Sequence, residues 1–281
     1  MSEHWEIPAS RALRADGLRV ADIDTSAKPG FPGRKKDGEE LLSERGRVLA
    51  GLQEKLYANG RSGDNRSVLL VLQGMDTAGK GGIVRHVIGS VDPQGVDHAA
   101  FGVPTEEEKR HHFLWRIRKE LPRAGQLGVF DRSHYEDVLV ARVHGLVPEA
   151  VWQPRYTEIN DFEQELTETG TTLVKVAMFV SLDEQKKRLR ERLERPDKYW
   201  KFNPGDIDER AYWPAYQQAY QDLLDRTCTD YAPWYVLPAD AKWFSRLAVT
   251  ELLIEALEKL DLSWPPANFD PAAELRRLDT A

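Results

Sequence analysis

Residues Ser67–Lys80 read Ser-Val-Leu-Leu-Val-Leu-Gln-Gly-Met-Asp-Thr-Ala-Gly-Lys, and this stretch decides the fold. Its first seven residues form an apolar run without polar alternation, which is typical of a strand buried on both faces of a parallel sheet. The remainder matches GxxxxGK, in which a glycine-rich loop gathers backbone amides around phosphate oxygens and the lysine reaches the outer phosphates. Because the loop lies between a predicted strand and a predicted helix, we interpret it as a phosphate-binding loop rather than a chance turn.

The loop departs from the usual pattern at one position. Gly81 follows Lys80 where such loops ordinarily have Ser or Thr, whose hydroxyl helps to hold Mg²⁺. Asp76, inside the loop, is the candidate replacement, because Mg²⁺ favours carboxylate and phosphate oxygens. We therefore expect Mg²⁺ as the cofactor, with Mn²⁺ as an alternative. Phosphate contacts are expected from Gly74, Met75, Thr77, Ala78, Gly79 and Gly81.

A second carboxylate ends another apolar stretch, Leu127-Gly-Val-Phe-Asp131. An aspartate at the carboxyl end of a parallel strand faces the same crevice as the phosphate loop, so Asp131 is the second candidate ligand of Mg²⁺. The alternative is that it caps the helix that follows. Arg132 comes next, and its guanidinium could clamp the oxygens of a transferring phosphoryl group. A structural ion pair with Glu136 or Asp137 is the alternative for Arg132.

Strands and helices alternate along the chain. Apolar stretches predict further strands at 95–101, 126–130, 173–180 and 234–237, and helical spacing predicts helices at 39–59, 79–89, 105–120, 147–169, 183–194 and 242–260. Such alternation is typical of βαβ units with a parallel sheet covered on both faces. The predicted fold class is therefore α/β, with the three layers of a P-loop kinase around a central parallel sheet. No GxGxxG follows a strand, which disfavours a dinucleotide-binding fold.

We divide the chain into an N-terminal extension at 1–38, a P-loop domain at 39–264 and a C-terminal tail at 265–281. Residues 195–227 read as two helical pieces around Asn203-Pro-Gly-Asp206 with no strand between them, and we interpret them as a helical lid. A dense run of basic residues leads into this lid. Its members would hold a long anion, and we select Lys187, Arg188, Arg192 and Lys201. Taken singly, each of them has the alternative of lying on a solvated helix face.

Composition limits the cell compartment and the class of partner. The chain has 281 residues, 41% of them hydrophobic, one cysteine and a formal net charge of −7. No run approaches eighteen apolar residues and no secretory signal is evident, so we expect a cytoplasmic protein that does not bind membranes. The negative charge argues against a nucleic-acid partner, although a local basic cleft can still attract a polyanion.

Several motifs, in this order, resemble those of the type 2 polyphosphate kinases. They are Gly74-Met-Asp-Thr-Ala-Gly-Lys-Gly81, Phe101-Gly-Val-Pro-Thr105, Leu114-Trp-Arg116, Leu121-Pro122, Phe130-Asp-Arg-Ser-His-Tyr-Glu-Asp137, Trp200-Lys-Phe202 and Tyr231-Ala-Pro-Trp-Tyr-Val236. The resemblance implies a thymidylate-kinase-like fold and Mg²⁺-dependent phosphoryl transfer between inorganic polyphosphate and an adenine or guanine nucleotide. It also implies a homo-oligomer, either a dimer or a tetramer.

The resemblance assigns roles to particular residues. It implies a catalytic centre of Asp76, Lys80, Asp131 and Arg132, with basic lid residues guiding the polyphosphate. Ser133-His-Tyr-Glu136 is similar to the subgroup that phosphorylates both AMP and ADP, so Glu136 is expected at the acceptor nucleotide. We also expect Arg116 to contact that nucleotide.

Two other functions fit the same fold class. One is an ATP-dependent nucleotide kinase, which differs only in its phosphoryl donor. The other is a nucleotide-binding switch that signals through its lid. The chain has no NKxD motif for recognition of the base, which disfavours the switch.

Overall fold

The computed structural model describes residues 4–281 and has a central sheet of five parallel strands. The strands are β1 (Ser67–Gly74), β2 (Val96–Ala100), β3 (Leu127–Asp131), β4 (Thr171–Phe179) and β5 (Trp234–Pro238), in the order β2-β3-β1-β4-β5. All eight residues of β1 are buried, as its unbroken apolar run predicts. Each of the five expected strands is confirmed, and so is the α/β class.

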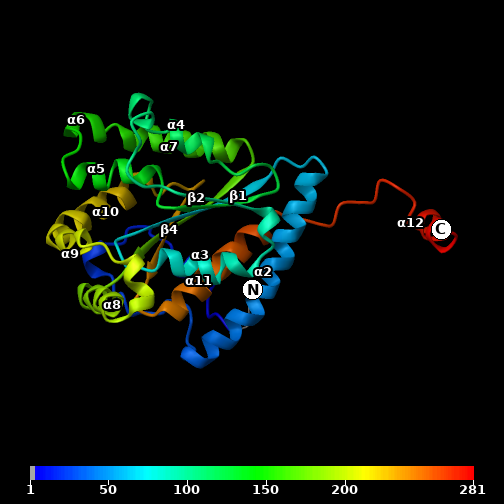
Figure 1. The fold of residues 1–281 in the computed structure, drawn as a ribbon, viewed down its shortest axis with the longest axis horizontal. Coiled ribbons are helices and arrows are strands. Elements are labelled where there is room, and N and C mark those ends of the chain that lie inside the picture. The colour runs from blue at the N-terminus through cyan, green and yellow to red at the C-terminus, as the bar shows by residue number, and fades with distance from the viewer. Residues whose placement is uncertain (1–3) are drawn as a thin grey trace.

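Helices cover both faces of the sheet (Figure 1). On one face lie α2 (Lys35–Arg61), α3 (Lys80–His86) and α11 (Lys242–Glu258), which bury their apolar side chains against alternate residues of β1 and β4. On the other lie α4 (Trp115–Lys119), α5 (Val140–Val143), α7 (Arg155–Glu168) and α10 (Trp213–Thr227). Two apolar cores therefore sandwich the sheet, which gives the three layers.

Two of the predicted helices are interrupted. The expected helix at 105–120 is reduced to a 3₁₀ turn at Glu108–Arg110 and the short α4, because residues 106–112 are all polar and have no apolar stripe to bury. The expected helix at 147–169 is divided into α6 (Glu149–Trp152) and α7 by Pro154, which stands directly before α7. The remaining 3₁₀ turns outside the lid are Val20–Asp22, Ile88–Ser90, Pro93–Gly95 and His134–Asp137.

The N-terminal residues have no core of their own and lie against the main domain. Trp5 and Phe31 are buried in the core beneath α11, as is Ala9 of the short helix α1 (Ala9–Ala12). The backbone at Leu13 and Ala15 pairs antiparallel with β5, through Val236 N–H to the Leu13 carbonyl (2.7 Å) and Ala15 N–H to the Trp234 carbonyl (3.0 Å). The segment thus covers the outer edge of β5, which would otherwise expose unpaired backbone groups.

The segment interpreted as a lid follows α8 (Leu182–Glu194). It contains a 3₁₀ stretch (Pro196–Lys201), α9 (Gly205–Asp208), another 3₁₀ turn (Glu209–Tyr212) and α10. Although the stretch up to Tyr212 has no buried residue, α10 buries Tyr220, Leu223 and Leu224 in the core. Only residues 196–212 therefore form an exposed cover, and α10 belongs to the body of the protein.

The C-terminal helix α12 (Pro271–Asp279) stands away from the body at the end of an extended segment (Figure 1). None of its residues is buried. Among residues 4–281, no helix is long and apolar enough to cross a membrane.

Candidate functional site: a phosphate loop between two cavities

The phosphate loop connects β1 to α3. Thr77 and Gly79 have positive φ angles of 66° and 119°, which turn the backbone so that successive amides face inward. Within the described chain the amides of Asp76, Thr77 and Gly79 donate to no protein acceptor, and the buried Thr77 Oγ1 also has no partner. An unpaired buried hydroxyl is costly, and the unpaired loop amides are available as donors, so this loop is suited to an anion that would bond both.

Lys80 is the first residue of α3 and is almost completely buried. Its ammonium group donates to the carbonyl of Gly74 across the mouth of the loop. Burial and the nearby Arg132 lower the pKa of Lys80, whereas the carboxylates of Asp131 and Asp76 act in the opposite direction. The lysine therefore lies where its charge can neutralise a phosphate bound to the loop.

Asp131 and Arg132 lie beside this loop because β1 and β3 are neighbours. In the sheet register Leu72 of β1 is paired with Asp131, and the Arg132 amide donates to the Leu72 carbonyl (3.0 Å). Arg132 has a φ of 66°, a conformation that a non-glycine residue adopts only at an energetic cost. Its guanidinium bonds Asp76 Oδ1 (2.9 Å). The structure thus brings together the four residues predicted to form the catalytic centre.

The donor set fits Mg²⁺. Asp76 and Asp131 are partly exposed, and the carboxylate of Asp131 makes no hydrogen bond or ion pair within residues 4–281. The same residues contain no cluster of three or more metal-ligating side chains. Mg²⁺ ordinarily takes only one or two protein carboxylates and completes its shell with water and substrate phosphates, so these two suffice.

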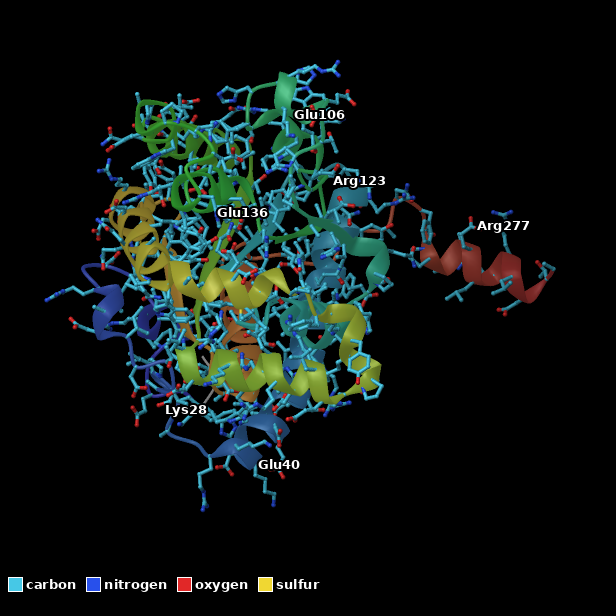
Figure 2. All side chains as sticks on the ribbon, turned by 60° about the vertical axis from the view of Figure 1, so that its left-hand side comes forward. Lys28, Glu40, Glu106, Arg123, Glu136 and Arg277 are labelled. Atoms are coloured by element: carbon cyan, nitrogen blue, oxygen red, sulfur yellow. The ribbon has the colours of Figure 1, made fainter. Side chains whose placement is uncertain are left out.

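Glu136 lies in the 3₁₀ turn His134–Asp137, in which the Tyr135 amide donates to Ser133 Oγ (3.2 Å). In the amide orientation that satisfies its neighbours, Gln73 donates to Glu136 Oε1 (2.9 Å) and accepts from Ser133. Arg132 lies 4.0 Å from the other carboxylate oxygen. Burial raises the pKa of Glu136 in spite of the opposing charges of Arg132 and Lys80. Glu136 lies within the body of the molecule (Figure 2).

Glu136 faces a cavity of ≈ 310 Å³ that we call the acceptor cavity. It is lined by Gly74, Met75, Asp76, Val103, Arg132, Glu136, Leu139, Val140, His144, Gln185, Asn203, Gly205, Asp206, Glu209, Tyr216 and Tyr220. Four carboxylates share this cavity with one guanidinium, and two tyrosines of α10 close one side. Burial and the charge of Asp76 raise the pKa of Asp206, in spite of its ion pair with Arg192 (3.0 Å).

A second cavity of ≈ 270 Å³, which we call the basic cavity, lies at the other side of the loop. Its lining includes Thr77, Gly79 and Gly81 of the loop and a single acidic residue, Glu191. Its basic residues are Arg85, His86, Arg188, Arg192, Lys198, Lys201, Lys242 and Arg246. Two cavities of opposite charge character thus meet at the phosphate loop.

The four basic residues selected near the lid differ in their surroundings. The guanidinium of Arg188 is buried and donates to the carbonyls of Thr77, Ala78, Ala239 and Asp240, and its Nε donates to Glu184 (2.9 Å). It therefore braces the phosphate loop. Lys187 is exposed and pairs with Glu184 (3.4 Å). Lys187 does not line the basic cavity.

Arg192 and Lys201 do line the basic cavity. Arg192 donates to the Lys201 carbonyl (3.0 Å) and also pairs with Asp206 of the lid. The sequence interpretation did not select the other five basic residues of this cavity, which are Arg85, His86, Lys198, Lys242 and Arg246. Arg85 lies one helical turn after Gly81, so its position could have been predicted from the spacing, whereas Lys242 and Arg246 come from the distant helix α11.

Arg116 lies apart from the acceptor cavity and lines a separate hollow beside β2. It is buried, donates to the Gly102 carbonyl (2.9 Å) and lies 3.6 Å from Asp137. Asp137 also pairs with Arg155 (3.1 Å). The structure therefore connects Arg116 to the turn that carries Glu136 and not to the cavity itself.

The strand order, the phosphate loop and the carboxylates at the sheet edge define a P-loop phosphotransferase. The family model described as Polyphosphate kinase 2 (PPK2) matches residues 33–264, and the chain belongs to this family. It is accordingly an enzyme that transfers phosphate. The resemblance inferred from its motifs is confirmed.

Individual relatives are similar over most of their length. The AMP/ADP-polyphosphate phosphotransferase of Meiothermus ruber is 48% identical over 242 residues, covering 86% of this chain and 88% of that protein. The ADP-polyphosphate phosphotransferase of Rhodopseudomonas palustris is 42% identical over 258 residues, with coverage of 86% and 88%. The crystal structure of Polyphosphate Kinase 2 from Arthrobacter aurescens TC1 is 52% identical, with a TM-score of 0.96 and coverage of 99% and 98%.

Proposed function

We propose that this enzyme transfers phosphoryl groups between inorganic polyphosphate and AMP or ADP, with polyphosphate in the basic cavity and the nucleotide in the acceptor cavity. The observation that carries the proposal is the meeting of these two cavities at one phosphate loop. Transfer needs donor and acceptor to approach one another in line, and the loop with Lys80 and Arg132 lies between them. The names of the relatives from Meiothermus ruber and Rhodopseudomonas palustris support both substrates.

The basic cavity suits a long polyanion. A chain of phosphates carries a negative charge on every unit. The lining of the basic cavity has eight basic side chains and one acidic side chain. Cavity walls of a single charge sign raise the local concentration of an oppositely charged ligand. A nucleotide donor would need a surface for its base, and this lining contains no aromatic side chain except that of His86.

The acceptor cavity suits a nucleoside monophosphate or diphosphate. Tyr216, Tyr220 and Leu139 offer apolar surface for a base and ribose, while Arg132 lies at the loop end for the phosphate. This lining accommodates an adenine nucleotide, and a guanine nucleotide is its alternative. The carboxylates of Glu136 and Asp76 beside it call for a cation whenever phosphate enters.

Mg²⁺, with Mn²⁺ as an alternative, would be held by Asp76 and Asp131, and it supplies charge neutralisation at phosphate oxygens when bound. The protein's own groups act alongside. Lys80 and the loop amides bind the phosphate at the loop, Arg132 orients the transferring group, and the cover at 196–212 excludes water. No protein nucleophile is required, because the acceptor phosphate oxygen attacks directly.

The donor is tested by incubating the purified protein with ADP and Mg²⁺, supplied with polyphosphate or with no donor. We expect ATP in excess of the no-donor control only with polyphosphate. The Lys80→Met variant should abolish this excess. An enzyme that phosphorylates AMP from ATP but not from polyphosphate would contradict the proposal and establish a nucleotide kinase instead.

The choice of acceptor rests on Glu136. AMP leaves vacant the space that the β-phosphate of ADP fills, and a carboxylate there can organise water or a cation in that space. Glu136→Asn should therefore lower kcat/KM for AMP more than for ADP. If Glu136 only maintains its contacts with Gln73 and Arg132, kcat/KM will fall equally for AMP and ADP, and the ratio of the two values will stay unchanged.

We also propose a cytoplasmic homo-oligomer, a dimer or a tetramer, to which α12 contributes. Leu275 and Leu278 of α12 are exposed, and a helix of nine residues is not stable alone in water. Residues 265–281 are 17 of 281 residues, about 6% of the chain, so a TM-score of 0.96 over 99% of the chain requires at least part of this tail to superpose on the Arthrobacter structure. An arm that keeps its place without support from its own body is suited to docking on a second copy.

A further inference from the structure

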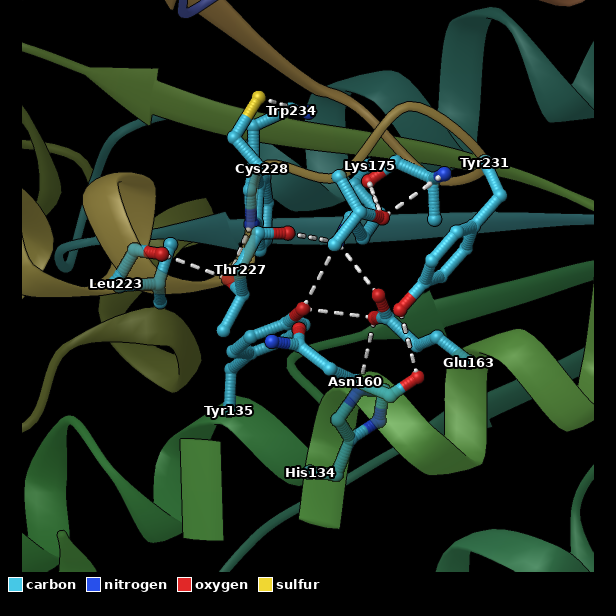
Figure 3. A network of polar contacts seen from close by, with 12 residues as sticks. His134, Tyr135, Asn160, Glu163, Lys175, Leu223, Thr227, Cys228, Tyr231 and Trp234 are labelled. Carbon is cyan, nitrogen blue, oxygen red and sulfur yellow. Dashed lines mark hydrogen bonds and ion pairs between the residues drawn. The ribbon is translucent and has the colours of Figure 1, made fainter. Parts of the chain in front are cut away.

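A buried polar network connects β4 and α7 with the turn that carries Glu136 and with the end of α10 (Figure 3). At its centre, Lys175 of β4 donates to Glu163 Oε2 of α7 (2.6 Å), and both side chains have no exposed surface. The same ammonium group donates to Tyr135 OH (3.0 Å) and to the Thr227 carbonyl (2.7 Å). All three of its N–H groups are therefore used.

Tyr135 and His134 complete the hydrogen bonds of the network. Tyr135 OH donates to Glu163 Oε1 (2.7 Å), and His134 Nε2 lies 3.2 Å from the same oxygen. His134 Nδ1 is buried and has no partner, so the tautomer that leaves no donor unsatisfied is the neutral ring with its proton on Nε2. The ion pair with Lys175 helps to lower the pKa of Glu163 despite its burial. The network thus holds one cation and one anion, both fully hydrogen-bonded.

Such a pair is not explained by stability alone. Removing two charges from water is expensive, and a well-packed apolar pair of the same volume is often equally stable. What an ion pair adds is a fixed geometry, because each partner satisfies the other at only one separation and orientation.

The network joins the two walls of the acceptor cavity. Tyr135 precedes Glu136 in the 3₁₀ turn that forms one wall. Thr227 is the last residue of α10, which carries Tyr216 and Tyr220 of the opposite wall. Lys175 of β4 bonds directly to both Tyr135 and Thr227.

We propose that Lys175 and Glu163 are positioning residues for the acceptor, whose buried pair sets the Glu136 turn at a fixed distance from α10. This role rests on the proposed function in one respect, namely that the nucleotide occupies the cavity between these walls. Neither residue lines that cavity, and neither lines the basic cavity on the far side of the loop. Their loss should therefore affect the nucleotide selectively.

The test compares Glu163→Gln and Lys175→Met with the parent enzyme. Each should raise the KM for AMP by roughly tenfold, since displacements of the order of an ångström weaken binding contacts strongly, while the KM for polyphosphate stays within about twofold. The double variant buries no charge and should recover stability, but it still lacks the three donors of Lys175. Its KM for AMP should therefore remain high.

A matched control separates positioning from general destabilisation. Glu251 of α11 forms a largely buried ion pair with Arg45 (2.7 Å), and neither residue lines the acceptor cavity or the basic cavity, so Glu251→Gln removes a comparable pair. We expect it to lower thermal stability without changing either KM. The positioning role is overturned if the network variants match this control, or if the KM values for AMP and polyphosphate rise together.

Two other outcomes, a variant that does not fold and a parent enzyme without polyphosphate-dependent transfer, are tested separately. If a single charge removal prevents folding, Tyr135→Phe keeps the ring packed on Trp234 and deletes only the hydroxyl, and it should still raise the KM for AMP selectively. If the parent shows no polyphosphate-dependent transfer, the proposed function fails. In that case AMP binding measured calorimetrically in parent and variants still decides the positioning role, because equal dissociation constants would overturn it.

Discussion

Arg132 has an energetically unfavourable backbone conformation at the candidate catalytic centre. Its positive φ is unfavourable for arginine, yet that turn lets the chain leave β3 with the Arg132 side chain directed at Asp76. Asp76 in turn lies in the loop that lacks the usual hydroxyl. The two residues are 56 positions apart in the sequence, and only the pairing of β1 with β3 brings them together.

The replacement of the missing hydroxyl by Asp76 can be tested at one other position. A Cβ atom at Gly81 would meet nothing within 4 Å, so Gly81→Ser should be accommodated. Asp76→Asn should lower kcat by roughly 100-fold or more, and raised Mg²⁺ should restore part of it. Adding Gly81→Ser to Asp76→Asn should improve the apparent affinity for Mg²⁺, as measured by metal titration of the rate. An Asp76→Asn enzyme that is active at ordinary Mg²⁺ would refute the role.

The buried Glu136 should lower the free energy of unfolding at neutral pH. Because burial raises its pKa, the folded state keeps this proton to a higher pH than the unfolded chain, whose carboxyl ionises near its ordinary pKa of about 4.3. Stability therefore falls as pH rises from the unfolded pKa to the folded pKa. Glu136→Gln should match the parent at about pH 4 and exceed it at pH 7 in urea unfolding without ligands. A variant that is less stable at pH 7 would show that the pairing with Arg132 outweighs burial.

At the scale of elements, the phosphate loop depends on a brace from α8. Arg188 ties the Thr77 and Ala78 carbonyls of the loop to the Ala239 and Asp240 carbonyls after β5. From the sequence we predicted that Arg188 binds a long anion, because a run of basic residues does not reveal which side chain faces inward. The inward orientation of Arg188 depends on how α8 packs on the loop.

This brace predicts a distinctive kinetic effect. Arg188→Met removes the side-chain donors to the Thr77 and Ala78 carbonyls, so the loop should lose its shape and kcat should fall by roughly 100-fold. The KM for polyphosphate should change less than kcat. Lys187→Met, one residue earlier and exposed, is the matched control and should leave both parameters unchanged. A pure rise in the KM for polyphosphate in Arg188→Met would restore Arg188 to the role of an anion ligand.

Local patterns predicted the elements that have strong periodicity. Four of the strands are largely apolar runs with buried residues on both faces, and Gly74–Lys80 carries its own chemistry, so both could be read directly. The edge strand β2 has no fully buried residue and is not such a run. The helix at 105–120 could not, because charged residues with high helix propensity form no helix there without an apolar face to bury. The full lining of the basic cavity could not be predicted from the sequence either, because Lys242 and Arg246 reach it only through the packing of α11.

At the scale of the whole molecule, both ends of the chain act beyond the sheet. The N-terminal segment covers the edge of β5 and also holds α10, where the Val20 amide donates to Gln221 Oε1 (2.7 Å). The C-terminal arm reaches in another direction, with Arg277 well outside the body (Figure 2). One end thus completes the fold, while the other offers a contact to a second copy.

Deletion of residues 264–281 tests the second of these roles. We expect the full chain to be oligomeric by light scattering and the deleted chain to have a lower mass at equal concentration. Thermal stability of the separated protomer should change little, because α12 buries none of its residues on its own chain. Leu275→Glu with Leu278→Glu should reproduce the deletion, while Arg276→Glu serves as the control. An unchanged mass would contradict a docking role for the arm.

We propose that polyphosphate and nucleotide approach the phosphate loop from opposite sides, and one kinetic cross-comparison tests this arrangement. Lys198→Met with Lys242→Met changes only the basic cavity, and Tyr216→Ala changes only the acceptor cavity. We predict that the first variant raises the KM for polyphosphate by roughly tenfold, weakens its dependence on salt and leaves the KM for AMP unchanged. The second should raise the KM for AMP alone. If each variant raises both KM values, or if the effects are exchanged, donor and acceptor do not occupy separate sides of the loop.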